Sequence, residues 1–179
     1  MRLLPTELTL KVVQSLKKCV SKCETRENLQ VLRVEYTAEG MLFVATDGHA
    51  LVTLTVYGME LAATERTPFC LDNLDVLEAR LKSAAKLKEP FVEVTPAEGV
   101  EYPTWSQCIA LDRPSPELDC GFAAKLITRC AEVFTRWNVI PCVTLHTANM
   151  QLRMQGTLRD CTGREKLVSI GAWIMGHRL

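Results

Sequence analysis

Three segments of the chain repeat apolar residues every three or four positions, the spacing that places them on one face of an α-helix. In the first segment Leu8, Val12, Val13 and Leu16 form this face, and Thr6 is a residue type that caps helices. The pattern therefore predicts three amphipathic helices. Their predicted ranges are Thr6–Lys22, Asp72–Lys86 and Asp119–Trp137.

Between the helices, short runs of apolar residues and of alternating apolar and polar residues are typical of β-strands. Asp47-Gly48 separates two of these runs and predicts a tight hairpin, because both central residues of such a turn favour positive φ. Hairpins between neighbouring strands give antiparallel sheets, so the predicted fold class is α+β with helices on one face. The predicted strands are Leu32–Tyr36, Met41–Ala45, Ala50–Val56, Phe91–Thr95, Gln107–Leu111, Val143–His146, Gln151–Met154 and Leu167–Ile174.

One stretch, Arg113-Pro114-Ser115-Pro116, has the composition of a linker. It divides the chain into two predicted units, residues 1–112 and residues 113–179, with the second packed on the first. At 179 residues the chain is long enough to bury a sizeable core.

Composition restricts the function classes. Hydrophobic residues make up 47% of the chain and charged residues 23%, which is typical of a soluble globular protein. Lys and Arg number 21 and so do Asp and Glu, so the formal net charge is zero. This balance argues against bulk electrostatic capture of nucleic acid, and DNA contact requires basic residues gathered on one face.

The N-terminus lacks a long apolar run, so the sequence predicts no secretion signal. It predicts no membrane span either, because no stretch approaches the roughly 18 apolar residues that cross a bilayer. We therefore expect a cytoplasmic protein with reduced thiols. The eight cysteines are scattered without a Cys-x2-Cys pair, so they are expected to be small core residues and no metal is expected. No cofactor fingerprint occurs, and no nucleophile accompanies His49 and Asp47, so no catalytic residue is assigned.

Four motifs, in order along the chain, resemble those of the bacterial sliding clamp, the β subunit of DNA polymerase III. The clamp's middle domain carries Glu-Thr-Arg after its first helix and an Ala-Thr-Asp-Gly-His-Arg-Leu hairpin, which Glu24–Arg26 and Ala45–Leu51 match. Glu101–Trp105 looks like the segment that closes that domain, and Trp173–Leu179 is similar to the clamp's C-terminal tail. The resemblance implies a DNA-clamp-like fold with curved antiparallel sheets. It also implies a short, phage- or mobile-element-type protein joining a middle-domain-like unit to the end of a third domain.

The resemblance also implies a peptide-binding pocket, because in this family the hairpin and the tail converge on an apolar site for short peptides of polymerases and other replication proteins. Three family residues differ here: Ala50 replaces arginine, Gly176 replaces proline and His177 replaces methionine, so altered specificity is expected. The alternative is that the hairpin is only a turn and the tail only a last strand. The matching positions are Thr46, Gly48, His49, Leu51, Met175 and Arg178.

The family lines its ring with helices whose basic residues meet DNA phosphates without reading sequence. The alternative is an ordinary solvated helix face. The candidate DNA-binding residues are Lys11, Lys18, Lys22, Lys125, Arg129 and Arg136.

Three hypotheses follow. The first is a non-enzymatic replication accessory protein that binds polymerase-type peptides and double-stranded DNA, as a homo-oligomer where it encircles DNA. The second is an interaction protein that occupies clamp-binding peptides as a decoy or regulator without encircling DNA. The third, a metal- or thiol-dependent enzyme, lacks a supporting motif.

Overall fold

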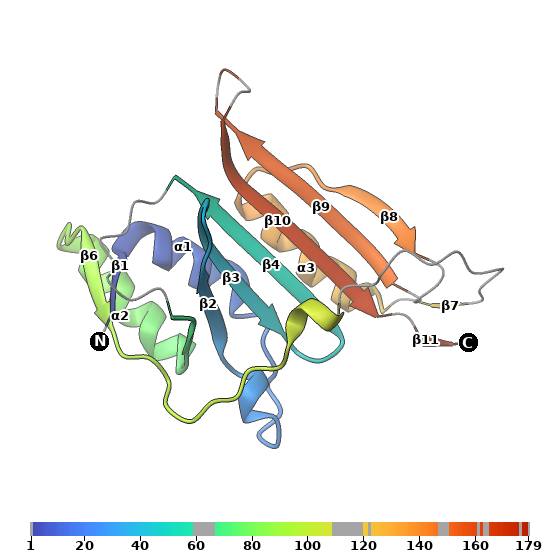
Figure 1. Cartoon of the computed structure of the whole chain (residues 1–179), viewed down its shortest axis with the longest axis horizontal. Helices are drawn as coiled ribbons and strands as arrows, with labels where there is room; N and C mark the ends of the chain where they lie inside the picture. The colour runs from blue at the N-terminus through green and yellow to red at the C-terminus, as the bar shows by residue number, and fades with distance from the viewer. Residues whose placement is uncertain are drawn as a thin grey trace.

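The computed structural model describes residues 2–58, 67–108, 120–121, 123–146, 151–160, 162, 165–175 and 177–178. Helices and strands alternate along these residues (Figure 1). The elements up to residue 108 are β1 (Arg2–Pro5), α1 (Thr6–Leu16), β2 (Leu32–Tyr36), β3 (Gly40–Thr46), β4 (Ala50–Tyr57), β5 (Phe69–Leu71), α2 (Leu74–Lys86) and β6 (Phe91–Val94), with 3-10 turns at Glu27–Leu29 and Trp105–Cys108. The later elements are β7 (Cys120–Gly121), α3 (Ala124–Arg136), β8 (Cys142–His146), β9 (Gln151–Arg159), β10 (Lys166–Met175) and β11 (His177–Arg178).

A seven-stranded sheet in the order β5-β2-β3-β4-β10-β9-β8 forms the centre of the molecule. Its strand pairs are antiparallel. The pairing of Ala50–Val56 with Val168–Ile174 joins two strands more than a hundred residues apart in sequence. Two small sheets, β1-β6 and β11-β7, complete the described strands. The prediction of an α+β fold with antiparallel sheets is confirmed.

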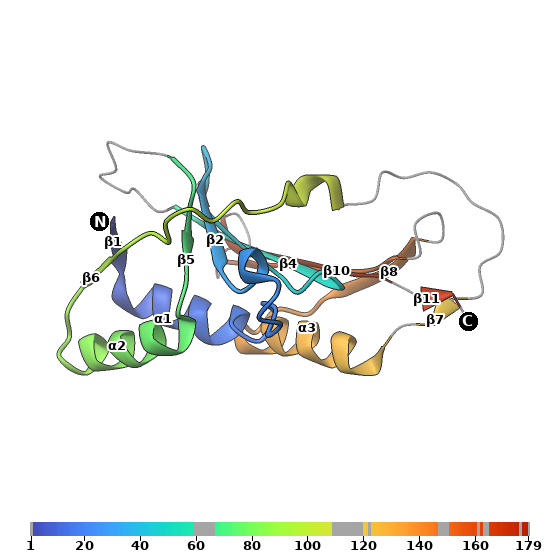
Figure 2. The same cartoon turned by 90° about the horizontal axis from the view of Figure 1, so that it is seen from below.

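Side chains alternate between the two faces of the large sheet. Val52, Leu54 and Ile170 lie on one face and are buried, whereas Thr55 and Ser169 lie on the other. The helices α1, α2 and α3 run along the apolar face (Figure 2), which confirms the prediction that the helices share one face. The opposite, outer face of the sheet therefore carries polar side chains with hydroxyl groups at these positions.

One apolar core lies between the helices and the sheet and includes residues from both ends of the chain. Phe134 and Val133 of α3 are fully buried against it. Trp137, just after α3, donates a hydrogen bond from Nε1 to Ser15 Oγ of α1 at 3.0 Å. The last helix is thus fixed both to the sheet and to the first helix.

The predicted helix limits need correction. The first helix ends at Leu16 and not at Lys22, because the chain turns there and Ser21 N donates to Leu29 O. Cys19 and Val20 continue the apolar spacing but enter the core from this turn. Thr6 is not the cap: Pro5 holds that position, and the buried Thr6 hydroxyl has no partner among the described residues.

The second helix begins at Leu74 and not at Asp72, because Asn73 adopts a left-handed conformation with φ of 45°. The third begins at Ala124 and not at Asp119, since Cys120–Gly121 pair with the end of the chain as a strand. The strand predicted at Gln107–Leu111 is wrong at its start, where Trp105–Cys108 form a 3-10 turn, and residues 109–111 lie outside the described residues.

Four short strands escaped prediction, because none is long enough to show a clear period of two. Arg2–Pro5 pairs with β6 and Phe69–Leu71 pairs with β2, whereas Cys120–Gly121 and His177–Arg178 pair with each other. The predicted unit boundary near residue 112 falls outside the described residues and stays a prediction. In the described part of the chain, no helix combines the length and apolarity needed to cross a membrane.

Charged side chains connect α1 to α2. Lys17 Nζ lies 2.8 Å from Asp75 Oδ1 and 2.5 Å from Glu78 Oε2, and Lys82 Nζ lies 2.7 Å from Glu78 Oε1. Glu78 is buried. The hydrogen bonds from Lys17 and Lys82 lower the pKa of Glu78 from 4.5 to about 2.

Acid is expected to destabilise the fold through Glu78. The pKa of Glu78 in the folded protein is below its ordinary value of 4.5. Its contribution to the free energy of unfolding is therefore complete above pH 4.5 and is lost as the pH falls toward about 2. Urea unfolding at pH 7 and pH 3 is expected to show a smaller acid loss for Glu78→Gln than for the wild type. Asp75→Asn, at a 92% exposed side chain, is the control and is expected to follow the wild type closely. Equal losses in wild type and Glu78→Gln would contradict this assignment.

Candidate peptide-binding site and helix layer

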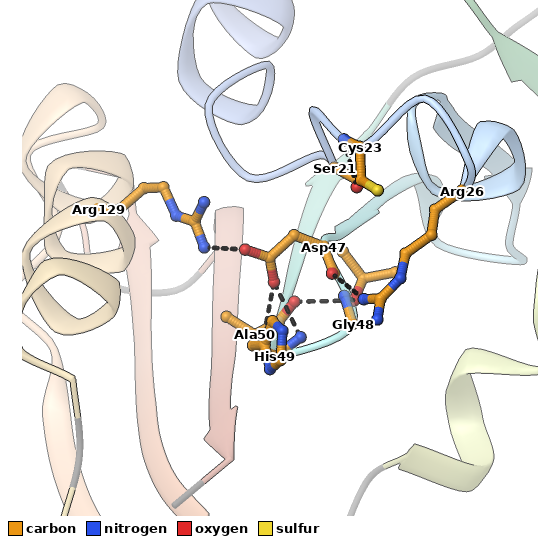
Figure 3. Close-up of polar contacts among 9 residues, drawn as sticks. Ser21, Cys23, Arg26, Asp47, Gly48, His49, Ala50 and Arg129 are labelled. Carbon is orange, nitrogen blue, oxygen red and sulfur yellow. Dashed lines mark hydrogen bonds and ion pairs between the residues drawn. The ribbon is translucent and has the colours of Figure 1, made fainter.

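The hairpin between β3 and β4 is closed by its own polar groups. Thr46 Oγ1 donates to Ala50 O at 2.8 Å and accepts from Gly48 N at 3.1 Å. Asp47 Oδ1 accepts from both His49 N and Ala50 N at 2.9 Å (Figure 3). Gly48 has φ of +88°, a conformation that L side chains rarely adopt, whereas Asp47 does not have positive φ. The expectation that both turn residues take positive φ is therefore wrong for Asp47.

Two arginines hold the hairpin from opposite sides. Arg26, from the Glu24–Arg26 motif, donates from Nη1 to Asp47 O at 3.3 Å. The same Nη1 lies 2.9 Å from where a Cβ on Gly48 would be, so a larger residue there would displace Arg26. Arg129 of α3 forms an ion pair with the Asp47 carboxylate, as Figure 3 shows.

The Asp47 carboxylate is ionised in this setting. Burial by itself raises its pKa, but the backbone N–H groups of Ala50 and His49 and the Arg129 guanidinium together outweigh burial. The pKa of Asp47 therefore lies below its ordinary value.

The end of β10 lies beside the hairpin. Met175 N donates to His49 O at 2.9 Å, and Trp173 is the register partner of Leu51. The Met175 side chain is 41% exposed, and its Sδ accepts from Gln151 Nε2 at 3.1 Å. The structure thus brings together Thr46, Gly48, His49, Leu51 and Met175, five of the six residues predicted for the peptide site.

Arg178, the sixth, lies in β11, where its backbone pairs with Cys120, and its side chain is outside the described residues. Gly176 also falls outside them. His177, the other tail residue that differs from the clamp sequence, lies in β11, where its backbone pairs with Gly121.

An apolar island interrupts the polar outer face of the sheet beside the hairpin. Val44, Leu51 and Trp173 form it, with Tyr102 and Trp105 packed against it. Tyr102 Oη donates to Val44 O at 3.2 Å, and Trp105 Nε1 donates to Glu35 Oε1 at 2.9 Å. The segment Glu101–Trp105 is thus attached to the outer face next to the candidate site.

The Trp173 ring lies close over Gly171. A Cβ on Gly171 would be 2.5 Å from Trp173 Cη2, so glycine is needed for this close approach. Arg153, the register partner of Trp173 on β9, places its guanidinium carbon 5.7 Å from the ring centroid. Trp173 Nε1 is buried without a hydrogen-bond partner in the described structure.

Sequence reasoning did not assign Val44, Tyr102, Trp105 or Trp173 to the site. The signal was present for Tyr102, Trp105 and Trp173, because two of the four clamp-like motifs contain them. Nothing in the sequence separates Val44 from an ordinary strand residue, since only the pairing of β3, β4 and β10 places it in the island.

The helix layer carries an excess of positive charge although the whole chain is neutral. The helices at residues 6–16, 74–86 and 124–136 contain seven Lys and Arg residues and four Asp and Glu residues, an excess of three. Because the chain totals 21 of each sign, the remaining residues carry a matching excess of negative charge. The side of the sheet that the helices cover therefore has a small positive excess.

Neighbouring groups already engage several of the predicted DNA-binding residues. Lys18 pairs with Glu132 at 2.7 Å, and Arg136 Nη1 donates to Gln14 Oε1 at 3.1 Å. Lys11 Nζ lies 4.2 Å from the centroid of the Trp137 ring, an attractive cation–π contact.

Lys125 is exposed in the first turn of α3, and Lys22 is exposed beyond the end of α1. Lys18 also lies past Leu16, so neither Lys18 nor Lys22 is on a helix face as predicted. Arg129 stands apart, since it pairs with the hairpin.

The cysteine prediction is confirmed in part. Cys19, Cys70 and Cys130 are buried, and burial raises the pKa of Cys19 and of Cys130 to about 12, which favours the protonated form of these two thiols. Cys23 and Cys142 are exposed, so for them the core assignment is wrong. Within the described ranges, no three His, Cys, Asp or Glu residues are grouped to hold a metal ion.

The sequence matches no protein-family model and no curated protein. Solved structures of bacterial sliding clamps have a fold similar to that of this chain. The DNA polymerase III β subunit of Pseudomonas aeruginosa has a TM-score of 0.52 and 13% identity, over 99% of this chain and 66% of that chain. The Caulobacter crescentus clamp has a TM-score of 0.51 and 15% identity, over 99% of this chain and 65% of that chain.

The β subunit of Thermotoga maritima has a TM-score of 0.50 and 14% identity, over 99% of this chain and 51% of that chain. These likenesses show that the chain has the fold of the bacterial DNA polymerase III sliding clamp, as the sequence motifs predicted. The chain spans about half to two thirds of the length of these clamps.

Proposed function

We propose that this protein is a non-enzymatic, sliding-clamp-like accessory protein of DNA replication that binds short peptides of polymerases and other clamp-binding proteins. The observation that carries the proposal is the meeting of the hairpin with the end of β10, next to the island of Val44, Leu51 and Trp173. An exposed Met175 beside a preformed turn is suited to an apolar or aromatic peptide side chain. A sliding clamp of similar fold, from Pseudomonas aeruginosa, has been solved bound to griselimycin.

Titration of the protein with clamp-binding peptides tests this proposal. We expect weak, saturable binding with a Kd between roughly tens of micromolar and the millimolar range, because burial of two apolar side chains contributes ~3–6 kcal/mol. No saturable binding to well-folded protein would reject the proposal, and the hairpin would then be structural only.

Contact with double-stranded DNA is the second part of the proposal. The positive excess on the helix layer supports it, because the acidic residues that neutralise the chain are mostly elsewhere. The contact is expected to be weak, since Lys18 and Arg136 already have partners. This form of the proposal includes a homo-oligomer that encircles the DNA.

Replacing Lys11 and Lys125 together with glutamate is expected to abolish DNA binding. Each change removes a candidate phosphate contact and adds a repulsive charge, and the wild-type affinity is expected to fall steeply as salt rises. Fluorescence anisotropy with a labelled duplex at several salt concentrations measures both effects. Lys166→Glu, at a lysine of β10 away from the helices, is the control and is expected to bind like the wild type.

An absence of wild-type binding at low salt would reject DNA contact and favour the alternative function, an interaction protein acting as decoy or regulator without encircling DNA. The partners that Lys18 and Arg136 already have support this alternative, because they compete with DNA phosphates for these two side chains. We also propose that the protein acts in the cytoplasm and that it is a short clamp-like protein of the phage or mobile-element type.

A further inference from the structure

Arg129 differs from the other predicted DNA-binding residues in its partner. Lys18, Arg136 and Lys11 contact residues of the helices or of the turn after α3. Arg129 instead directs its Nη2 to Asp47 Oδ2 in the hairpin, and its side chain is only 20% exposed.

Asp47 connects Arg129 to the backbone of the turn. While Oδ2 meets Arg129, Oδ1 accepts from the backbone N–H groups of His49 and Ala50. The carbonyl of His49 in turn accepts from Met175 N. One carboxylate therefore links α3, the turn and, through the turn, the end of β10.

We propose that Arg129 is a positioning residue of the peptide site, which fixes the hairpin through Asp47 and makes no contact with DNA phosphates. This inference rests on the proposed peptide-binding function. The hairpin carries His49 and borders Met175, so its orientation sets the shape of the surface that a peptide meets.

The local electrostatics support this role. The Asp47 side chain is 13% exposed, and removing one partner of a largely buried ion pair leaves the other charge uncompensated. A DNA phosphate would have to displace a carboxylate that two backbone N–H groups already hold in place. Arg129 Nε is buried without a hydrogen-bond partner, so the guanidinium is oriented by Asp47 and not by a wider network in the described structure.

The test compares Arg129→Gln, Arg129→Lys and Asp47→Asn with Lys125→Gln. Asp47→Asn keeps an oxygen that can accept from His49 N and Ala50 N but removes the charge that faces Arg129. Lys125 lies one turn earlier on α3 and is exposed, so Lys125→Gln is a matched loss of one positive charge. Peptide affinity, the salt dependence of DNA affinity, and hydrogen exchange of the His49 and Ala50 amides are measured for each protein.

We expect Arg129→Gln and Asp47→Asn each to weaken peptide binding about tenfold, and the double variant to bind no more weakly than either single variant. Arg129→Lys is expected to recover part of the affinity, because it keeps the charge. Hydrogen exchange at His49 and Ala50 is expected to be faster in Arg129→Gln. DNA affinity and its salt slope are expected to be unchanged in Arg129→Gln and reduced in Lys125→Gln.

A lower salt slope with unchanged peptide affinity in Arg129→Gln would overturn the inference and return Arg129 to the DNA contacts. Additive losses in the double variant would also overturn it. Failure of the wild type to bind any peptide would reject the proposed function instead. In that case hydrogen exchange still decides about Arg129, since unchanged exchange at His49 and Ala50 would show that it does not fix the hairpin. If Arg129→Gln does not fold, Asp47→Asn and Arg129→Lys carry the same comparison.

Discussion

Replacing Met175 with aspartate is expected to weaken peptide binding by roughly 10- to 100-fold while leaving the fold intact. The Met175 side chain is 41% exposed at the end of β10, so a charge there meets water in the free protein. In the complex the charge would have to be buried against the apolar part of the peptide. Losing the burial of one such side chain removes ~1.5–3 kcal/mol of binding free energy.

Leu167→Asp provides a matched control for this experiment. Leu167 lies at the opposite end of the same strand and has nearly the same exposure, 42%. Isothermal titration calorimetry with one peptide is expected to give wild-type affinity for Leu167→Asp and a large loss for Met175→Asp. Equal affinities of the two variants would place the peptide elsewhere. Leu51 is less suitable for this purpose, because it is only 5% exposed and a charge there would also disturb the sheet.

Truncating Phe134 to alanine is expected to destabilise the protein by about 3–5 kcal/mol. Phe134 is buried in α3, and its removal leaves a cavity in the core that the helices and the sheet share. Because this core includes residues from both ends of the chain, we expect one cooperative unfolding transition that shifts as a whole. Urea unfolding followed by tryptophan fluorescence and by far-ultraviolet circular dichroism measures the shift with two independent signals.

The control for Phe134→Ala is Thr135→Ala at the next position. Thr135 is exposed, and its hydroxyl donates only to Ala131 O of the same helix, at 3.1 Å. Its replacement is expected to change the free energy of unfolding by less than about 0.5 kcal/mol. Two separate transitions in Phe134→Ala, with only one of them shifted, would show that the residues near the C-terminus fold independently of the rest.

The sequence by itself determined the class of the fold and the location of its main elements. Apolar spacing identified the three helices, and Asp47-Gly48 identified the hairpin between β3 and β4. These predictions succeeded because periodicity and turn preference act between residues close together in the chain. The same reasoning missed Arg2–Pro5 and Phe69–Leu71, since those strands exist only through partners distant in sequence.

The predicted helix limits were wrong where the apolar spacing continues but the backbone is no longer helical. Cys19 and Val20 have the spacing of a helix face, yet they reach the core from a turn that is held by the bond from Ser21 N to Leu29 O. Burying an apolar side chain lowers the free energy of the folded state whether the backbone at that residue is a helix or a turn. Periodicity alone therefore extended the helix beyond Leu16.

The sequence likewise predicted only part of the candidate site. Motif resemblance named the hairpin and the final strand from residues that are adjacent in sequence. Only the tertiary structure paired β4 with β10, which built the island of Val44, Leu51 and Trp173 and set Met175 N against His49 O. It also decided the partner of Arg129, because an arginine on a helix surface is available to any nearby anion. The fold placed Asp47 within its reach, although 82 residues separate the two in sequence.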